Sequence, residues 1–356
     1  MSWFGGVMNG NNTAYEIEVT YTAGALQGYY NVTAGGSDMT NVWVDWGDGS
    51  AFEQVSAILS QPVYGKISHT YAAGTYRFRV FQQDFELTTG NDIAWQGYDY
   101  ANSFPNVTNP KFISFGLVTT ARLIFGHNSN SGNTQWNFAH LQNYPISLDS
   151  RDFTWMFSFI PSQATLNDNF LVDWFNTPAL SPTTIVNFFY GTNITQVQNI
   201  GNWDMSACTN MQGALYWSNS ASLNPNLSGW NLSACTSLQR TFWSQSSFNN
   251  GGDAGIGDWD TSNVTTFDGT FRNCSAFNQD IGGWSMASVV TFGSDKGILE
   301  GCSAFDQDIS AWGTNDGGMN TTAATFTKML TNCGMSTTNY SRWLICLANW
   351  AYDNSY

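Results

Sequence analysis

Charged side chains are scarce in this sequence, and basic ones are the scarcest. Asp, Glu, Lys and Arg together make up 10% of the 356 residues, whereas about 25% is usual for a soluble domain. Only 11 residues are Lys or Arg, against 26 Asp or Glu, so the formal net charge at pH 7 is −15. Because proteins bind nucleic-acid phosphates through clustered basic residues, the composition argues against a nucleic-acid partner.

Signals for membranes and export are also missing. No run approaches the roughly 18 apolar residues of a membrane-spanning helix, so we expect no membrane insertion. Residues 1–6 do not combine a basic segment with an apolar one, as an export signal does. If Met1 is the natural start, this favours a protein that is assembled in the cytoplasm and released by lysis.

Motifs for catalysis are lacking too. The sequence contains no nucleophile elbow, phosphate-binding loop or zinc-protease motif, and it has only three His. We therefore expect no enzymatic activity. The abundant Asp residues leave a polysaccharide-degrading carboxylate pair open as an alternative.

What the chain does contain is enough apolar material to fold. Hydrophobic residues make up 42% and aromatic residues 16% of the sequence, which excludes a disordered chain, and the length is sufficient for two cores. Polar uncharged residues dominate the remainder, a composition more usual in extracellular or virion proteins than in cytosolic enzymes.

Tryptophan recurs at a nearly constant interval in the second half of the chain. Trp174, Trp203, Trp230, Trp259, Trp284 and Trp312 follow one another at intervals of 25 to 29 residues. Such a period predicts a solenoid, in which each repeat buries its apolar side chains against its neighbours.

Each copy has two recognisable parts. Short pieces such as Ile256-Gly-Asp-Trp259 predict a one-rung strand. Apolar triplets spaced i, i+3, i+7 follow and predict one face of a helical turn. These triplets are Cys208/Met211/Leu215, Cys235/Leu238/Phe242, Val264/Phe267/Phe271 and Ala323/Phe326/Leu330.

These copies resemble the BspA-like leucine-rich-repeat surface proteins. Phe277–Trp284 and Trp259-Asp-Thr-Ser-Asn-Val264 match the repeat of that family, although Phe, Leu or Cys replaces its usual Met or Val at several positions. The resemblance covers residues 148–356 and implies adhesion or display. It also implies repeats over 148–335 and a helical cap over 336–356, with Leu344, Leu347 and Ala351 on the apolar face of the cap.

The front of the chain resembles a different family. Expected strands are separated by turns, and two segments are diagnostic: Val44-Asp-Trp-Gly-Asp-Gly-Ser50 and His69-Thr-Tyr, which continues to Val80. Both resemble the PKD-type Ig-like β-sandwich, which implies a sandwich over residues 14–85 and a structural role for His69. Residues 1–13 are interpreted as an arm, and residues 86–147 as a connector that also caps the solenoid. The expected fold class is thus mostly β with short helices.

One column of the repeats suggests a binding surface. The residue after each third apolar position is Tyr190, Tyr216, Trp243, Arg272 and Glu300 in successive copies, and Trp217 adjoins them. Stacked rings beside a cation would suit a sugar ligand or an aromatic-anchored protein contact. The alternative is a half-buried layer that shields the apolar triplets.

Two further columns bear on cofactors. Asp280 and Asp308, with Asp253 and Asp258 near the same loop, either supply oxygens to Ca²⁺ or bind the amides of their own turns. Cys208 and Cys235 take the position that Val264 and Val289 take in later copies, and Cys274, Cys302 and Cys333 form a column of their own. A Cys that substitutes for Val is a small buried side chain, so we expect free buried thiols. Disulfides between neighbouring rungs remain geometrically allowed. No Cys-x-x-Cys spacing predicts a metal site, so Ca²⁺ is the one cofactor with any candidates.

Together these features predict a non-enzymatic surface protein. We expect it on the exterior of a bacteriophage particle, as capsid decoration, tail fibre or knob. Its expected partners are other virion proteins or further copies of itself, and a host glycan or envelope protein. The alternative is a bacterial cell-surface adhesin or a component of an extracellular filament.

Overall fold

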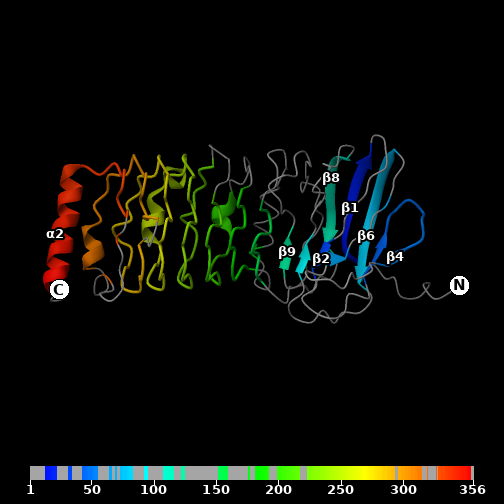
Figure 1. Ribbon diagram of the computed structural model, residues 1–356, viewed down its shortest axis with the longest axis horizontal. Helices are drawn as coiled ribbons and strands as arrows, with labels where there is room; N and C mark the ends of the chain where they lie inside the picture. The colour runs from blue at the N-terminus through cyan, green and yellow to red at the C-terminus, as the bar shows by residue number, and fades with distance from the viewer. Residues whose placement is uncertain are drawn as a thin grey trace. The chain divides into compact units, whose positions relative to one another are not determined.

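The structure is a computed structural model, and it divides the chain into two compact units, Met1–Phe170 and Leu171–Tyr356 (Figure 1). The division lies within the segment that the sequence assigned to the first repeats. The residues described below are 13–21, 31–33, 42–54, 64–65, 69, 73–82, 92–94, 107–115, 122–124, 151–158, 175–176, 181–191, 199–216, 223–292, 296–314, 319, 326 and 328–353.

The first unit contains two sheets. A five-stranded antiparallel sheet has the order β4-β3-β6-β1-β8, and a four-stranded sheet has the order β5-β2-β7-β9 with β7 and β9 parallel. Their strands are β1 (Thr13–Tyr21), β2 (Asn31–Thr33), β3 (Val42–Asp45), β4 (Glu53–Gln54), β5 (Tyr64–Gly65), β6 (Gly74–Gln82), β7 (Asp92–Ala94), β8 (Val107–Phe115) and β9 (Arg122–Ile124).

The predicted connector over 86–147 does not stay separate from the predicted sandwich. Strand β8 pairs with β1, and β7 pairs with β2. Where β8 pairs with β1, Lys111 lies opposite Glu18 and Thr108 lies opposite Thr20. The register shifts between these two pairs, and Pro110 is left out of the pairing. A proline lacks the N–H that a central strand must donate, and β8 accommodates it by standing at the edge of its sheet.

The turn after β3 brings the two diagnostic segments together. His69 Nε2 lies 2.7 Å from Asp48 Oδ2, and the His69 ring stacks on Trp46 with centroids 4.8 Å apart. A hydrogen bond from the Ser50 side chain, and then the contact with His69, lower the pKa of Asp48 to about 2. Gly47 has a φ of 72°, and a Cβ there would overlap the carbonyl oxygen of Arg77. His69 therefore holds the turn in place, which is the structural role predicted for it.

The second unit consists of coils that lie side by side (Figure 1). Parallel bridges join Thr184 to Asn210, Asn210 to Ser237, Ser237 to Thr266, and Thr266 to Thr291. Backbone hydrogen bonds accompany each bridge; for example, Leu238 N donates to Thr266 O at 3.2 Å. Each coil is thus paired with the next through its backbone.

The two parts of each copy differ from the predicted conformations. The bridges lie inside the apolar triplets, whereas several tryptophan pieces form 3₁₀ turns: η2 (Asn199–Asn202), η4 (Ala254–Asp258) and η5 (Ser310–Gly313), with η3 (Asn250–Gly252) nearby. The predictions of a strand at the tryptophan and a helical turn at the triplet were wrong. A spacing of three also arises where a chain bends around a core and turns one side chain inward at each bend.

The tryptophans line the core in one column. The rings of Trp203, Trp230, Trp259 and Trp284 stack in sequence, with centroids 6.4, 6.1 and 5.9 Å apart. Each later indole donates its N–H to a carbonyl of the preceding coil, and the distances are 2.6 Å for Trp230 to Ile200, 3.2 Å for Trp259 to Leu227, 2.9 Å for Trp284 to Ile256 and 2.8 Å for Trp312 to Ile281. Trp203 has no such acceptor among the described residues.

The coils approach one another closely where the tryptophan piece begins. Gly257 and Gly282 hold equivalent positions, and a Cβ at either one would overlap a carbonyl oxygen of the following coil. At these two positions glycine is therefore required by packing between coils.

Side-chain amides form a second connection between coils. The backbone N–H of Asn249 donates to Asn224 Oδ1, that of Asn278 to Asn249 Oδ1, and that of Asp306 to Asn278 Oδ1, at 2.7 to 2.9 Å. Ser336 N completes the series by donating to Asp306 Oδ1 at 2.8 Å. Three asparagine amides and one carboxylate thus satisfy backbone N–H groups of the following coils.

Helix α2 (Thr337–Asp353) lies across the end of the coils (Figure 1). It buries Trp343 and Cys346, and the Trp343 ring meets Trp312 edge-on at 6.0 Å. Leu344, predicted on the apolar face of the cap, is instead 46% exposed. Among the described helices, none has the length and apolarity needed to cross a membrane.

The indole hydrogen bonds predict that losing a buried hydrogen bond between coils lowers stability more than losing an exposed one. Trp284→Phe removes a buried donor at 2.9 Å and leaves the Ile256 carbonyl with the longer bond from Trp259 N, at 3.4 Å, so the free energy of unfolding should fall by about 1 to 3 kcal/mol. Thr265→Val removes a bond from Thr265 Oγ1 to Thr236 O on the outside of the coils, where water can replace it. Urea unfolding should therefore show a loss below about 0.5 kcal/mol for Thr265→Val. Equal losses for the two variants would contradict this assignment.

Candidate functional site

The five residues of the predicted binding column lie in contact, one per coil. Tyr190 and Tyr216 meet with ring centroids 5.0 Å apart, and Tyr216 stacks on Trp243 at 4.7 Å. The guanidinium of Arg272 lies 4.6 Å from the Trp243 centroid, and its Nη2 donates to Glu300 Oε1 at 3.1 Å. We call these five residues the stripe. Trp217, the sixth predicted member, lies outside the described residues.

The backbone holds the stripe in order. The carbonyl of Tyr216 accepts from Gly191 N, that of Arg272 from Ser244 N, and that of Glu300 from Asn273 N, at 2.7 to 3.3 Å. Each of these stripe residues is therefore fixed to the coil before it. The alignment predicted from the sequence follows from this hydrogen bonding.

Trp243 does not present an open ring. Its side chain is only 9% exposed, because Tyr216 stacks on it at 22° and Arg272 lies close to the ring as well. At Trp243 the stripe is therefore a half-buried shielding layer, the alternative interpretation that the sequence left open for this column. A ligand can reach its neighbours, but it cannot stack on the faces of this indole without displacing them.

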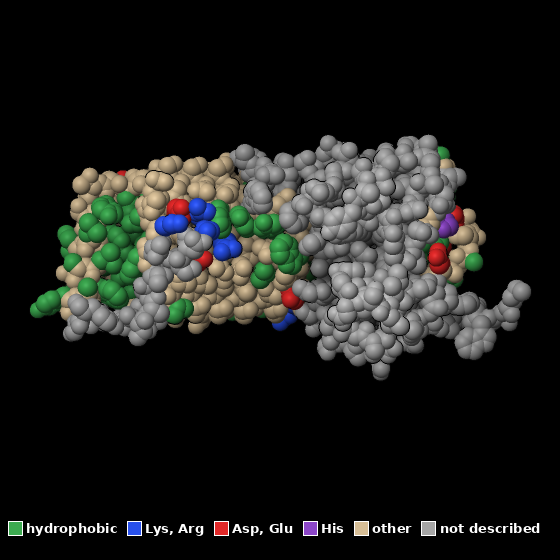
Figure 2. Space-filling model, in the orientation of Figure 1, with side chains coloured by type: hydrophobic (Ala, Val, Ile, Leu, Met, Phe, Trp, Pro, Cys, Tyr) green, Lys and Arg blue, Asp and Glu red, His purple; other side chains and the backbone are tan. Residues whose placement is uncertain are grey.

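Cations gather around Trp243. Besides Arg272, the Arg240 guanidinium lies 5.4 Å and Lys296 Nζ 5.7 Å from the ring centroid. Such approaches are favourable because the ring face carries negative electrostatic potential. Figure 2 shows Lys and Arg side chains gathered on this unit beside hydrophobic ones. Three of only 11 basic residues thus surround one tryptophan.

Arg272 and Glu300 form a partly buried ion pair. Their side chains are 23% and 13% exposed, and Arg272 Nε lies 3.0 Å from Glu300 Oε2 without a hydrogen bond at that nitrogen. At the other end of the stripe, burial and then the neighbouring Tyr216 raise the pKa of Tyr190. The stripe therefore runs from a partly dehydrated phenol to a partly dehydrated ion pair.

Sequence reasoning missed Arg240 and Lys296. Arg240 precedes Trp243 by three residues, a spacing that would have indicated a shared face under the helical turn expected from the sequence. Lys296 follows an insertion in its copy, which obscures its place in the column.

The candidate Ca²⁺ ligands bind their own turns. Asp280 Oδ1 accepts from Gly282 N, and Asp308 Oδ1 from Ser310 N, each at 2.9 Å. Asp308 also pairs with Arg342 at 3.0 Å, and hydrogen bonds from Ser310 lower its pKa. Among the residues that the structure describes, no three His, Cys, Asp or Glu gather as a metal site would require.

The cysteines are all free thiols. Cys274 Sγ donates to Phe242 O at 2.9 Å and Cys302 Sγ to Phe271 O at 3.0 Å. Burial raises the pKa of both thiols, and it raises that of Cys235 to about 12. They therefore serve as small buried side chains, as their columns predict.

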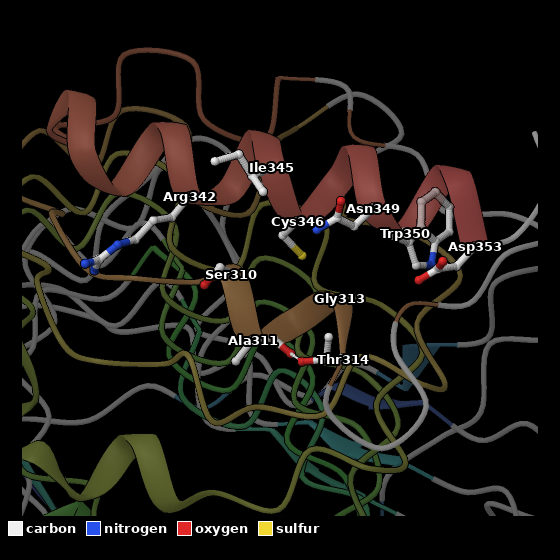
Figure 3. A pocket seen from close by; sticks show the side chains of 10 residues that line it. All are labelled: Ser310, Ala311, Gly313, Thr314, Arg342, Ile345, Cys346, Asn349, Trp350 and Asp353. Carbon is white, nitrogen blue, oxygen red and sulfur yellow. Dashed lines mark hydrogen bonds between the residues drawn. The ribbon is translucent and has the colours of Figure 1, made fainter.

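A groove adjoins the cap helix. It has a volume of about 610 Å³ and lies between α2 and η5, where Cys346 points toward Gly313 (Figure 3). Arg342, Asn349 and Asp353 line it from the helix. Nothing in the sequence indicated this groove, because it depends on how α2 lies on the last coil.

Comparison with known families matches three overlapping segments, residues 154–254, 183–312 and 219–343, to the family described as Mycoplasma protein of unknown function, DUF285. Together they span residues 154–343, which is 190 of the 356 residues. Overlapping matches are what a tandem repeat produces when the same pattern fits in several registers. No curated protein and no solved structure matches the chain.

The covered ring of Trp243 predicts a loss of stability when it is removed. Trp243→Ala should lower the free energy of unfolding by about 3 kcal/mol or more, because it opens a cavity between Tyr216 and Arg272. Tyr190→Ala, at the end of the stripe, should cost about 1 kcal/mol. Chemical denaturation of both variants tests this, and a Trp243→Ala variant as stable as the parent would show that the ring is not a packing element.

Proposed function

Because this chain belongs to the DUF285 family, whose function is unknown, we propose a function from its own repeat unit: non-enzymatic adhesion. In this proposal the coils are displayed at a biological surface, and the stripe contacts a glycan or an envelope protein of a host. The family match fits a surface repeat protein, which is the class that the sequence resembles.

The observation that carries the proposal is the continuity of the stripe across five coils. At about 4.8 Å per coil, five side chains extend over roughly 20 Å, a length suited to several units of a linear ligand. Aromatic edges, a phenol and cations along one line provide both apolar and hydrogen-bonding contacts. Binding would occur along ring edges and at the cations, since the Trp243 faces are covered.

The finer parts of the proposal concern fold and location. We propose that the first unit is a PKD-type Ig-like sandwich, supported by the contacts among Trp46, Asp48 and His69. The second unit would then be a leucine-rich-repeat-like solenoid, supported by the coil-to-coil bridges. The proposed location is the exterior of a bacteriophage particle, and the alternative is a bacterial cell surface. Labelling with an antibody against the chain would separate the two, by marking either purified particles or intact cells.

Binding to a glycan array tests the function. Arg272→Gln replaces the cation of the stripe with a shorter, uncharged polar side chain, and we expect it to weaken binding by about tenfold or more, the loss of roughly one charge-assisted hydrogen bond. Val290→Ala, on an exposed side chain outside the stripe, serves as the matched control and should bind as the parent does. Circular dichroism confirms that both variants are folded.

Unchanged binding by Arg272→Gln would remove the stripe from the interaction. Release of reducing ends from the bound polysaccharide would instead favour the enzymatic alternative.

A further inference from the structure

Exposed hydrophobic side chains concentrate on α2. Among the described residues, the large hydrophobic side chains that are exposed are Phe52, Val290, Tyr340, Leu344, Ile345 and Tyr352, so four of the six belong to this one helix. Ile345 is 61% and Tyr352 85% exposed. Hydrophobic side chains also gather over this end of the unit in Figure 2. Clustered exposure of this kind marks an interaction site rather than ordinary surface.

The outward face of α2 has a regular spacing. Trp343 and Cys346 point into the protein, and at 100° per residue the opposite side of the helix carries Ser341, Ile345, Ala348 and Tyr352. All four are exposed. Their spacing of four, three and four residues is that of a heptad seam, by which one helix packs along another.

We call Ser341, Ile345, Ala348 and Tyr352 the seam. The seam is complementary to itself in one orientation. If a second copy lies antiparallel, with a two-fold axis between Ile345 and Ala348, Ile345 faces Ala348 of the other copy. In the same register, Tyr352 faces Ser341. Each large side chain then meets a small one, as interdigitating helices require. Self-complementarity about a two-fold axis is the condition for a closed dimer.

The flanks of the seam favour the same orientation. Leu344 and Ala351 lie on one flank, and Arg342 and Asn349 on the other. Antiparallel pairing brings like flanks together, so apolar meets apolar and the Arg342 guanidinium comes near the Asn349 amide oxygen of the other copy. Parallel pairing would place Arg342 against Leu344. The helix has only Arg342 and Asp353 as charged residues, so pairing brings little charge repulsion.

From this geometry we propose that the outward face of α2 is a dimerisation surface for a second copy of this chain, packed antiparallel through Ser341, Ile345, Ala348 and Tyr352. A helix of 17 residues is about 25 Å long. One helix-to-helix contact of that length falls in the small interface class of weak complexes, below about 1,200 Å². The dimer should accordingly form at micromolar concentrations. The proposal does not depend on adhesion by the stripe.

Sedimentation velocity of the full chain, from about 1 to 300 μM, tests the proposal directly, since this range spans micromolar dissociation constants. The parent should convert from monomer to dimer as concentration rises. Ile345→Glu should weaken association by at least about tenfold, because an unpaired charge would be buried in the seam. Val290→Glu places the same charge on an exposed apolar residue away from α2 and should associate as the parent does. A parent that stays monomeric at the highest concentration would overturn the proposal and assign the face to another partner.

The register has its own test. Ile345→Glu and Ala348→Lys should each associate poorly alone. A mixture of the two variants should form a heterodimer, because the carboxylate introduced in one chain faces the ammonium group introduced in the other. Both substitutions are on exposed positions, so melting curves should match the parent. A parent that dimerises while the mixture does not would refute the antiparallel seam.

Discussion

A backbone carbonyl that cannot reach water must find donors within the protein. In the second unit the carbonyl before each tryptophan accepts the backbone N–H of that tryptophan, and an indole N–H from the next coil is its second donor. Trp230, Trp259, Trp284 and Trp312 each supply that donor. The same ring fills the core beside its neighbour, so one residue type provides both packing and hydrogen bonding. Because each coil buries its apolar side chains only against adjacent coils, the position of every other column depends on this one.

Side chains outside the core also align the coils, through hydrogen bonds from one coil to the next. Asparagine amides bond the backbone of the next coil, and threonine hydroxyls bond the carbonyl of the preceding one. These contacts are made by uncharged side chains, as expected in a sequence with 10% charged residues. The stripe is ordered by backbone hydrogen bonds between coils, and Ser336, the residue before α2, closes the amide series by donating to Asp306. Fold and candidate site thus have a common origin in the repeat.

Parts of this arrangement could be predicted from the sequence and parts could not. The tryptophan and stripe columns were predictable, since a fixed period places equivalent residues in contact. The local conformation was not, because a spacing of three suits a helical turn as well as a chain bending around a core. The approach of Arg240 and Lys296 to Trp243 was not predictable from the column, because neither residue belongs to it. On α2, Leu344 was misassigned to the buried face, since Trp343 and Leu344 are adjacent apolar residues and contact with Trp312 selects the first, whereas the predicted Leu347 and Ala351 are half-buried.

Hydrogen exchange at the indole nitrogens tests the central claim most directly. In protein labelled with ¹⁵N-tryptophan, resonances assigned by single Trp→Phe substitutions would report each ring separately. The indole N–H groups of Trp230, Trp259, Trp284 and Trp312 should exchange at least about 1,000-fold more slowly than free indole, because exchange requires the coils to separate. Exchange of these four at the rate of an exposed indole would contradict the stacking of the coils through their tryptophans.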